Sequence, residues 1–362
     1  MENKPEVLIV MYTNWLGGGE ALIRDIFNQK CMKSKNKFID FLIIGNPPKE
    51  FTEGLVSNKY KVSIIRTPKL EFSRSFVFYF LSTIFVFYGF LVYLILNFNR
   101  ARCYKVIHFQ DPRSFILGFW FCKLIRAKPI LHCHGFNPIN KVLFSRLAQN
   151  IFKGAQFIFV SKAIKEKYIS PLSTINHKII YNCIDLEFWH IKRKKFDKFT
   201  FIHVGRWVDF KHQPDIIEIF TKLNDKYPET QLIIATPELP KNIQAPKNVF
   251  FKIGKSTQEI RELYAKSHCF VMFSDEREGW MLTIFEAMAA GLPVIGTNVG
   301  GMTAIEYPFK IKPGDKDGLY SLMELYLTDK SAREKAIKAS MKNAKLFSAE
   351  TTAKEWYALY FQ

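Results

Sequence analysis

The segment SDEREGWMLTIFEAMAAGLPVI, Ser274–Ile295, joins the end of an expected strand to an expected helix. The apolar run His268–Phe273 before it is typical of a buried strand. After an acidic turn that contains a glycine, apolar residues recur at helical spacing from Leu282 to Ala289, and Gly291-Leu292-Pro293 ends the helix. We therefore expect a strand, a tight turn and a helix here, which is the repeating unit of a parallel sheet.

Two glutamates bracket the start of this expected helix. Glu278 and Glu286 have seven residues between them, so they share one face if both belong to the helix and its first turn. Four backbone amides between them would have no partner inside the helix, those of Gly279, Trp280, Met281 and Leu282. Such a turn can hold a sugar or phosphate oxygen while the carboxylates accept hydrogen bonds from hydroxyls. Alternatively, both glutamates are solvated residues of an ordinary surface helix.

The chain of 362 residues is long enough for two domains with a core each. Residues 1–195 hold 30 Lys and Arg against 12 Asp and Glu, whereas residues 196–362 hold 22 against 21. A basic half indicates an anionic partner, and both a nucleic acid and an anionic membrane surface would satisfy it. The six cysteines have no CxxC and no regular spacing, which favours a reducing compartment over a disulfide framework or a zinc site. The start of the chain, MENKPEVLIVMY, has too short an apolar run for a signal peptide.

Apolar runs alternate with helical patterns along the chain, which predicts an α/β protein with parallel, doubly wound sheets. In the first half the expected strands are Glu6–Tyr12, Phe38–Ile44, Lys61–Arg66, Lys105–Phe109, Pro129–Cys133, Gln156–Val160 and Lys178–Tyr181. In the second half they are Thr200–Val204, Thr230–Ala235, Asn248–Ile253, Cys269–Phe273 and Pro293–Gly296. The basic segment Leu186–Phe199 is a candidate linker between the two series, and Ser331–Tyr360 has the pattern of two helices.

A glycine-rich turn follows the first expected strand at Gly17, Gly18 and Gly19, and a helical pattern begins directly after it. A glycine turn between a strand and a helix lets a ligand approach the backbone closely. The turn lacks the spacing GxGxxG, and no acidic residue follows at the distance typical of a dinucleotide site. A dinucleotide site is therefore weakly supported.

The stretch Phe76–Phe98 contains no charged residue, and as a helix it would be about 34 Å long, enough to cross a bilayer. A spanning helix conflicts with the topology because it would separate two halves of one sheet, and basic residues flank it on both sides. The milder polar residues lie close to one helical stripe: Ser75, Tyr79, Ser82, Gly89, Tyr93 and Asn97. We expect a helix that packs on its own sheet with one face and dips the other into lipid. A helix wholly buried between domain layers is the alternative.

Two cations follow an expected strand in Phe201–Lys211, FIHVGRWVDFK. Gly205 provides a tight exit from the strand, Arg206 and Lys211 lie in the loop, and Pro214 suits the first position of the next helix. Ligands of parallel sheets bind at the carboxyl ends of the strands, where two cations would neutralise a diphosphate. Either cation alone could be a solvated surface residue.

Together these motifs resemble the retaining glycosyltransferases of family 4, whose GT-B fold has two Rossmann-like domains facing a central cleft. In the second half the resemblance rests on G-R-x4-K (Gly205–Lys211), Gly254 after a strand, E-x7-E with E-G-W-x-L (Glu278–Leu282), G-L-P-V-I (Gly291–Ile295) and Gly300-Gly301. In the first half it rests on Gly17–Glu20 (GGGE), Ile130–Gly135 (ILHCHG) and Ile180–Asp185 (IYNCID).

The resemblance implies a role for each matched position. Arg206 and Lys211 would hold the diphosphate of a nucleotide-sugar as it leaves, and Glu278 would hold the donor sugar together with the amides of Gly279, Trp280, Met281 and Leu282. Glu286 would accept hydrogen bonds from the ribose hydroxyls, and the backbone near Gly254 would face the base. Gly17, Gly18 and Gly19 would approach the donor phosphates, and His134 would lie near the reacting carbon.

Several positions depart from the pattern of that family. Met281 stands where glycine is usual, which narrows the expected donor pocket, and His212 replaces a common glycine after the lysine. Tyr181 and Cys183 replace a proline and a glycine, and Ala304 stands where a glutamate is usual. These departures leave the identity of the donor open and affect the reaction class less.

No metal site and no cofactor are expected, apart from a UDP- or GDP-linked sugar as co-substrate. The run Asp315-Lys316-Asp317 spells D-x-D, a metal signature in a different glycosyltransferase fold. An apolar helical run follows it, so we expect a helix cap at Asp315 instead.

The motifs predict a metal-independent hexosyl- or N-acetylhexosaminyltransferase that moves a sugar onto a glycan acceptor in cell-envelope polysaccharide synthesis. The basic half and Phe76–Phe98 indicate a lipid-linked acceptor and a cytoplasmic enzyme that is peripheral on the inner face of the plasma membrane. A membrane-associated protein of the same fold that binds a nucleotide-sugar or glycan without transfer is the alternative. Nucleic acid is not an expected partner, because the sequence has no basic helix and no base-stacking motif.

The expected domain organisation follows from the two series of strands. The first domain covers residues 1–190, and a linker covers residues 191–199. The second domain covers residues 200–345, and a C-terminal helix at residues 346–362 is expected to pack back on the first domain.

Overall fold

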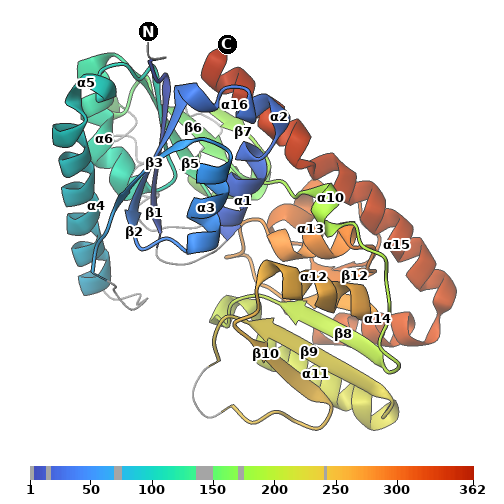
Figure 1. Cartoon of the computed structure of the whole chain (residues 1–362). Coiled ribbons are helices and arrows are strands. Elements are labelled where there is room, and N and C mark those ends of the chain that lie inside the picture. Colours follow the sequence, from blue (N-terminus) through green and yellow to red (C-terminus); the bar gives the residue numbers. More distant parts are fainter. Residues whose placement is uncertain (1–3, 14–17, 69–75, 136–149, 170–174, 240–242) are drawn as a thin grey trace. The chain divides into compact units, whose positions relative to one another are not determined.

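The computed structural model describes the chain except for residues 1–3, 14–17, 69–75, 136–149, 170–174 and 240–242, and it describes residues 76–79 by their backbone alone. The chain divides into two compact units (Figure 1). Unit 1 consists of residues 1–183 and 349–362, and unit 2 consists of residues 184–348. Gly17 lies outside the described residues.

Unit 1 is built on a seven-stranded, wholly parallel sheet with the strand order β3-β2-β1-β4-β5-β6-β7. The order runs outward from β1 in both directions, which is the arrangement of a doubly wound sheet. The strands are β1 (Val7–Thr13), β2 (Ile39–Gly45), β3 (Lys61–Ile65), β4 (Val106–Phe109), β5 (Lys128–Cys133), β6 (Gln156–Phe159) and β7 (His177–Ile179). The seven strands expected from the sequence are confirmed.

Helices cover both faces of this sheet (Figure 1). Val7, Ile9 and Met11 of β1 belong to the core that α1, α3 and α16 close on one face, and α4 and α6 cover the other face. The described helices of unit 1 are α1 (Gly18–Phe27), α2 (Lys30–Lys33), α3 (Lys49–Ser57), α4 (Phe76–Leu96), α5 (Phe98–Ala101), α6 (Pro112–Ile125), α9 (Lys162–Tyr168) and α16 (Ala349–Phe361). Because β1 has neighbours on both sides and helices on both faces, its sequence is a continuous apolar run.

Unit 2 contains a six-stranded parallel sheet with the order β10-β9-β8-β11-β12-β13. Its strands are β8 (Phe199–Val204), β9 (Thr230–Thr236), β10 (Val249–Ile253), β11 (Cys269–Met272), β12 (Val294–Thr297) and β13 (Lys310–Ile311). Its helices are α10 (Leu186–Trp189), α11 (Gln213–Lys226), α12 (Thr257–Lys266), α13 (Leu282–Ala289), α14 (Lys316–Thr328) and α15 (Lys330–Ala344). The five expected strands are confirmed, and β13 is an addition of two residues that the sequence did not predict.

The segment expected to link the domains is partly folded onto unit 2. Residues Leu186–Trp189 form α10, and the Trp189 side chain is buried. Further along, Nη1 of Arg193 donates to the carbonyl oxygen of Gly291 at 2.6 Å, and Nη2 donates to the carbonyl oxygen of Ser267. The basic composition of this segment predicts a linker without contacts. It does not reveal that Trp189 and Arg193 attach the segment to unit 2.

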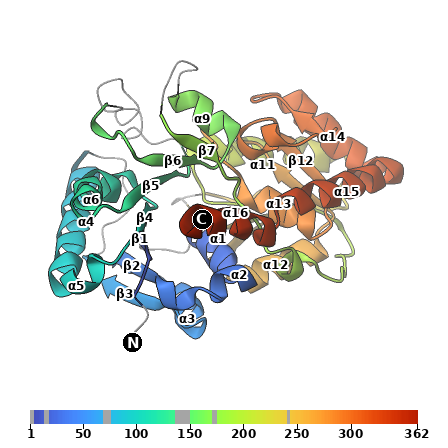
Figure 2. The ribbon, with the colours of Figure 1, turned by 90° about the horizontal axis from the view of Figure 1, so that it is seen from above.

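The helix α16 follows unit 2 in the chain but belongs to unit 1. It packs against α1 and α2 (Figure 2). Its buried residues Ala353, Trp356 and Tyr360 join the same hydrophobic core as β1.

The uncharged stretch forms α4, which packs against β2 and α6. The described residues that face the unit are Ser82, Val86, Gly89, Phe90 and Tyr93, all of which are buried. The exposed residues follow one another at helical spacing: Phe80, Ile84, Phe87, Tyr88, Leu91 and Ile95, with Leu96 and Phe98 at the end. The alternative of a wholly buried helix is therefore wrong. In the part of the chain that the structure describes, no helix has the length and apolarity needed to span a bilayer.

Candidate functional site

The carboxyl ends of β8 and β11 bring two predicted residues together in unit 2. Nζ of Lys211 lies 2.7 Å from Oε2 of Glu278, and only 11% and 12% of these two side chains are exposed. Gly205, where β8 ends, makes the approach possible, since a Cβ there would lie 3.3 Å from Cδ of Lys211. This largely buried ion pair therefore lies at the carboxyl edge of the sheet, where parallel sheets bind their ligands.

Arg206 lies on the same loop as Lys211 and is exposed. Its backbone carbonyl accepts a hydrogen bond from Nε2 of Gln213 at 2.7 Å, which ties the loop to the start of α11. The expected proline lies in the first turn of α11. The Arg206 side chain makes no ion pair within the described residues, so its guanidinium is available to an anion.

The turn that carries Glu278 differs from the expected helix start. The helix α13 begins only at Leu282, because Met281 adopts a left-handed backbone with φ 63°. Glu278 thus lies in a turn before the helix, so the helical period does not determine whether it shares a face with Glu286. The amides of Met281 and Leu282 donate to no group in the described part of the chain, as expected for residues at a helix start.

Two glycines pack against this turn and fix its position. At Gly301 a Cβ would lie 2.4 Å from the carbonyl oxygen of Trp280, and at Gly300 (φ 50°) it would lie 2.9 Å from that of Gly279. The Trp280 ring is buried, and it stacks on Phe285 with 4.9 Å between ring centroids. Trp280 therefore anchors the turn in the core of unit 2.

Glu286, on α13, is half-buried and lies beside the Tyr264 hydroxyl, 3.4 Å from it through Oε2. Burial raises the pKa of Tyr264, so the phenol remains a neutral hydrogen-bond donor toward this carboxylate. No motif in the sequence marks Tyr264. At the end of β10, Gly254 is exposed with φ 61°, and a Cβ there would meet no atom within 4 Å. The backbone at Gly254 is thus open to a flat ligand group.

In unit 1 the predicted residues lie at the carboxyl ends of β1 and β5. Gly18 and Gly19 form the start of α1, directly after the residues that are not described. His134 follows β5, and its Nε2 lies 2.5 Å from Oε1 of Gln110 at the end of β4. Burial lowers the pKa of His134 to about 4, so its imidazole is neutral at neutral pH.

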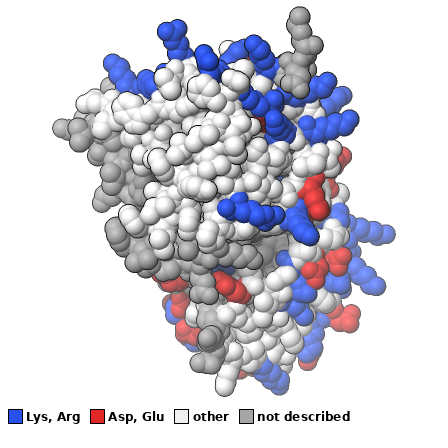
Figure 3. Space-filling model, turned by 60° about the vertical axis from the view of Figure 1, so that its left-hand side comes forward, with Lys and Arg blue, Asp and Glu red and all other residues white. Residues whose placement is uncertain are grey.

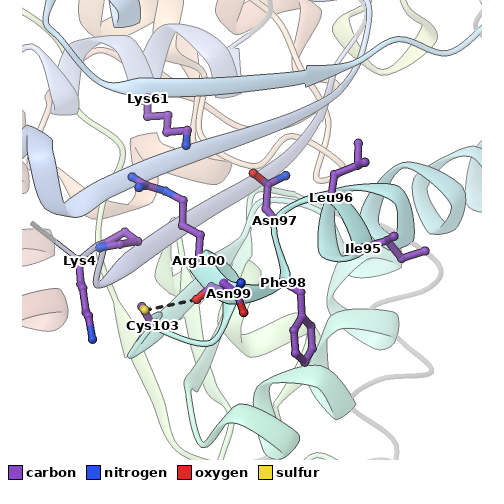
Figure 4. A pocket seen from close by; sticks show the side chains of 10 residues that line it. Lys4, Lys61, Ile95, Leu96, Asn97, Phe98, Asn99, Arg100 and Cys103 are labelled. Atoms are coloured by element: carbon purple, nitrogen blue, oxygen red, sulfur yellow. Dashed lines mark hydrogen bonds between the residues drawn. The ribbon is translucent and has the colours of Figure 1, made fainter. Parts of the chain in front are cut away.

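A pocket of about 490 Å³ in unit 1 contains none of the predicted site residues. It lies at the opposite edge of the sheet, near the starts of β1 and β3, and Lys61 points into it toward Arg100 and Asn97 (Figure 4). The guanidinium of Arg100 forms an ion pair with Asp40, with 2.6 Å between Nε and Oδ2. Because ligands of parallel sheets bind at the carboxyl edge, we do not assign the donor site to this pocket.

The D-x-D run is a helix cap, as expected. The Asp315 side chain accepts a hydrogen bond from the amide of Gly318 at 2.8 Å, where α14 begins. Among the residues that the structure describes, no group of three or more His, Cys, Asp or Glu side chains is arranged to hold a metal ion.

Comparison with known proteins finds a family model that matches unit 2. Residues 187–343 match the model of the glycosyl transferases group 1. The chain is 26% identical over 172 residues to N-acetyl-alpha-D-glucosaminyl L-malate synthase of Bacillus anthracis, which covers 44% of each chain. It is 26% identical over 280 residues to the capsular polysaccharide biosynthesis glycosyltransferase CapM of Staphylococcus aureus, covering 67% of this chain and 72% of CapM. The chain spans less than half the length of the first curated relatives it matches.

Solved structures show the fold of the whole chain. Alr3699/HepE of Anabaena in complex with UDP and glucose has a TM-score of 0.77 at 17% identity, covering 98% of this chain and 99% of that one. The lipopolysaccharide outer core galactosyltransferase WaaB has a TM-score of 0.67 at 16% identity, covering 97% and 98%. The chain has the GT-B fold of two Rossmann-like units, and its segment 187–343 matches the model of the glycosyl transferases group 1. The expected fold class is confirmed.

Proposed function

We propose that this protein is a glycosyltransferase that moves a sugar from a nucleotide-sugar donor to an acceptor hydroxyl. The observation that carries the proposal is the Lys211–Glu278 pair at the carboxyl edge of the unit 2 sheet, within the segment that matches the family. It places a cation suited to a diphosphate beside a carboxylate suited to sugar hydroxyls. A UDP-linked hexose or N-acetylhexosamine is the proposed donor, and the Anabaena structure in complex with UDP-glucose supports the UDP part.

Each site residue has a role in the proposed reaction. Transfer breaks the bond between the anomeric carbon and a phosphate oxygen and leaves a diphosphate anion. Lys211 and Arg206 stabilise that charge as it develops, and such electrostatic stabilisation usually contributes more to catalysis than any other single effect. The acceptor hydroxyl attacks on the face from which the phosphate leaves and gives its proton to the leaving oxygen. The anomeric configuration is then retained, and neither a protein base nor a metal ion is required.

Glu278 neutralises Lys211, since the two charged groups are in contact. A bound donor replaces both halves of this contact, because its diphosphate oxygens accept from the ammonium and a sugar hydroxyl donates to the carboxylate. Glu286 and the backbone at Gly254 take the ribose and the base.

A panel of UDP-glucose, UDP-N-acetylglucosamine and GDP-mannose tests the proposal through nucleotide release and thermal stabilisation of the purified protein. We expect Lys211→Ala and Glu278→Ala each to lower nucleotide release at least roughly a hundredfold. Lys222→Ala is the matched control, since Nζ of Lys222 pairs with Glu218 at 3.0 Å on the exposed surface of α11. Full release by Lys211→Ala would overturn the proposal. Stabilisation by a donor without any release would favour the non-catalytic binding protein, and loss of activity in EDTA with recovery in Mg²⁺ would contradict metal independence.

We also propose that the enzyme works on the inner, cytoplasmic face of the plasma membrane and that its acceptor is lipid-linked. The exposed apolar stripe of α4 is the basis, and Trp120 and Leu124 of the neighbouring α6 extend it. Between Phe76 and Lys128 the single acidic residue is Asp111, which is buried and paired with Arg113 at 2.6 Å. Lysines and arginines gather along the upper edge of this face (Figure 3). The likeness to CapM supports a role in cell-envelope polysaccharide synthesis.

A further inference from the structure

Unit 1 contains a stack of imidazole and indole rings between its sheet and α16, which we call the histidine column: His134, His132, His108 and Trp356. The centroids of the His134 and His132 rings are 4.0 Å apart, and those of the His108 and Trp356 rings are 4.4 Å apart with 17° between their planes. The rings come from the ends of β4 and β5 and from α16. His108 and His132 are buried, and His134 is half-buried. Such rings in contact need a function or a compensation, because their nitrogens are costly to remove from water.

A chain of hydrogen bonds runs alongside the column and connects α16 to His134. Nδ1 of His108 lies 2.5 Å from the Tyr360 hydroxyl. On the other side of the ring, Nε2 of His108 lies 2.9 Å from Nε2 of Gln110. Oε1 of Gln110 in turn lies 2.5 Å from Nε2 of His134. Gln110 and Tyr360 thus support His134, the residue that the sequence motif predicts, and neither stands in a motif that would reveal it.

The carboxamide of Gln110 determines where the protons are. An amide nitrogen only donates and an amide oxygen only accepts, so His108 accepts at Nε2 and His134 carries its proton on Nε2. Nδ1 of His134 is then a lone-pair acceptor, and it has no partner among the described residues. Burial lowers the pKa of all three histidines, and for His134 to about 4, which keeps this acceptor unprotonated at neutral pH.

We propose that Tyr360 is a positioning residue, which acts through His108 and Gln110 to hold His134 in one ring orientation and one tautomer. His134 then offers Nδ1 to a hydroxyl proton of a bound sugar, and this step rests on the proposed function. Without the hydrogen bond to Tyr360, the carboxamide of Gln110 could rotate by half a turn, so that its nitrogen donates to Nε2 of His134. The proton of His134 would then move to Nδ1, where the sugar hydroxyl needs an acceptor. Because α16 also contributes Trp356 to the column, the last helix forms part of the site's support.

The test compares Tyr360→Phe with Tyr357→Phe, one turn earlier on the same helix. The Tyr357 ring packs on Phe361 with 5.2 Å between centroids, and its hydroxyl makes no hydrogen bond within the described residues. With UDP-glucose or UDP-N-acetylglucosamine as the probe, we expect Tyr360→Phe to lower kcat for nucleotide release roughly tenfold with little change in KM. Tyr357→Phe should match the wild type. In a Gln110→Met background, Tyr360→Phe should have no further effect, since the chain is already broken.

A spectroscopic readout makes the test independent of the donor. In protein labelled with ¹⁵N-histidine, His134 should show a single neutral tautomer with its proton on Nε2. Tyr360→Phe should change the ring nitrogen shifts of His134, and Tyr357→Phe should not. Unchanged shifts in Tyr360→Phe would overturn the inference, as would additive losses in the double variant. If His134→Ala is fully active, the assigned role of His134 fails and the inference fails with it. If His134→Ala is slow while Tyr360→Phe is normal, the proposed function survives and the inference alone is wrong.

Discussion

Met281 and His212 of unit 2 adopt the left-handed backbone region that glycine occupies without strain. Met281 has φ 63° and His212 has φ 48°, and both stand where the resembled family usually has glycine. An L-residue in this region costs about 1–2 kcal/mol, because its Cβ approaches the following carbonyl oxygen. Their side chains offset the cost, since Met281 is buried and Nδ1 of His212 lies 2.9 Å from Oδ2 of Asp215. Met281 and His212 therefore change the side chains at the site, while the backbone keeps the left-handed conformation that glycine would adopt there.

A pair of substitutions at Met281 isolates the backbone strain. Met281→Gly and Met281→Ala both remove the long side chain, yet only the alanine retains a Cβ in the left-handed region. We expect the glycine variant to be more stable by about 1 kcal/mol, measured by chemical denaturation. At Ala287, in the middle of α13, glycine should instead be less stable than alanine by about 1 kcal/mol. Equal stability of the two Met281 variants would show that the backbone there is unstrained.

At the scale of elements, the helix α4 has an inverted pattern. The polar Ser82 and Tyr93 face the protein, where the Tyr93 hydroxyl lies 2.5 Å from that of Tyr104. The exposed side is apolar, with 68% of Ile95 and 75% of Leu96 accessible. A helix that turned this face to water alone would forgo the burial that normally stabilises amphipathic helices. A lipid surface resolves the conflict, because it covers the exposed face and leaves the polar contacts in place.

Flotation with vesicles of anionic phospholipid tests the α4 face. We expect Phe87→Glu and Leu91→Glu to abolish flotation of the full chain, since each places a charge in the middle of the exposed stripe. Val56→Glu on α3 is the matched control, as Val56 is an apolar residue on a different helix of unit 1 and is more exposed than Phe87 and Leu91. High salt and neutral lipid should weaken flotation, because each basic residue near an anionic surface contributes about 1 kcal/mol. Flotation by Phe87→Glu equal to that of the control would remove the membrane proposal.

The sequence predicted those elements whose side chains follow a simple period. Buried parallel strands such as β1 and β11 are continuous apolar runs, and the alternation of strands and helices determines the sheet class. It did not predict the late start of α13, because this depends on the backbone of one residue, Met281. The same holds for β13, whose two residues carry no periodic signal.

The candidate site was predictable where a motif marks it and not where the fold supplies a partner. Lys211 and Glu278 are separated by 66 residues of sequence, and the resemblance of their motifs to one family assigned both to the same donor. Tyr264, Gln110 and Tyr360 contact site residues through side chains on other elements. Contacts of this kind depend on the packing of a helix against a sheet, which periodicity cannot register.

For the whole molecule, buried neutral histidines make stability depend on pH. Burial lowers the pKa of His108, His132 and His134 in unit 1, and in unit 2 it lowers that of His203 to about 3 and that of His268 to about 4. The unfolded chain binds protons at these residues near pH 6.5, whereas the folded chain does not. These histidines therefore do not lower the free energy of unfolding above about pH 6.5, and they lower it increasingly as the pH falls toward 4.

A substitution at His132 checks the sign of this effect. Neither ring nitrogen of His132 has a hydrogen-bond partner among the described residues, and its ring faces those of His108, His134 and Trp356. Between pH 7.5 and pH 5, the free energy of unfolding should fall by about 2 kcal/mol less in His132→Phe than in the wild type, as measured by denaturation at each pH. The same substitution at the exposed His190 should leave the pH dependence unchanged. A steeper loss in His132→Phe would show that the imidazole is protonated in the folded protein.

The return of α16 to unit 1 sets an order for synthesis on the ribosome. Unit 2 is one uninterrupted segment, so it can fold as soon as it has left the exit tunnel. The core of unit 1 must wait for Trp356 and Tyr360, which are translated after every residue of unit 2. The nascent first half therefore emerges with a sheet face still uncovered, and it is completed only when translation has passed the second half.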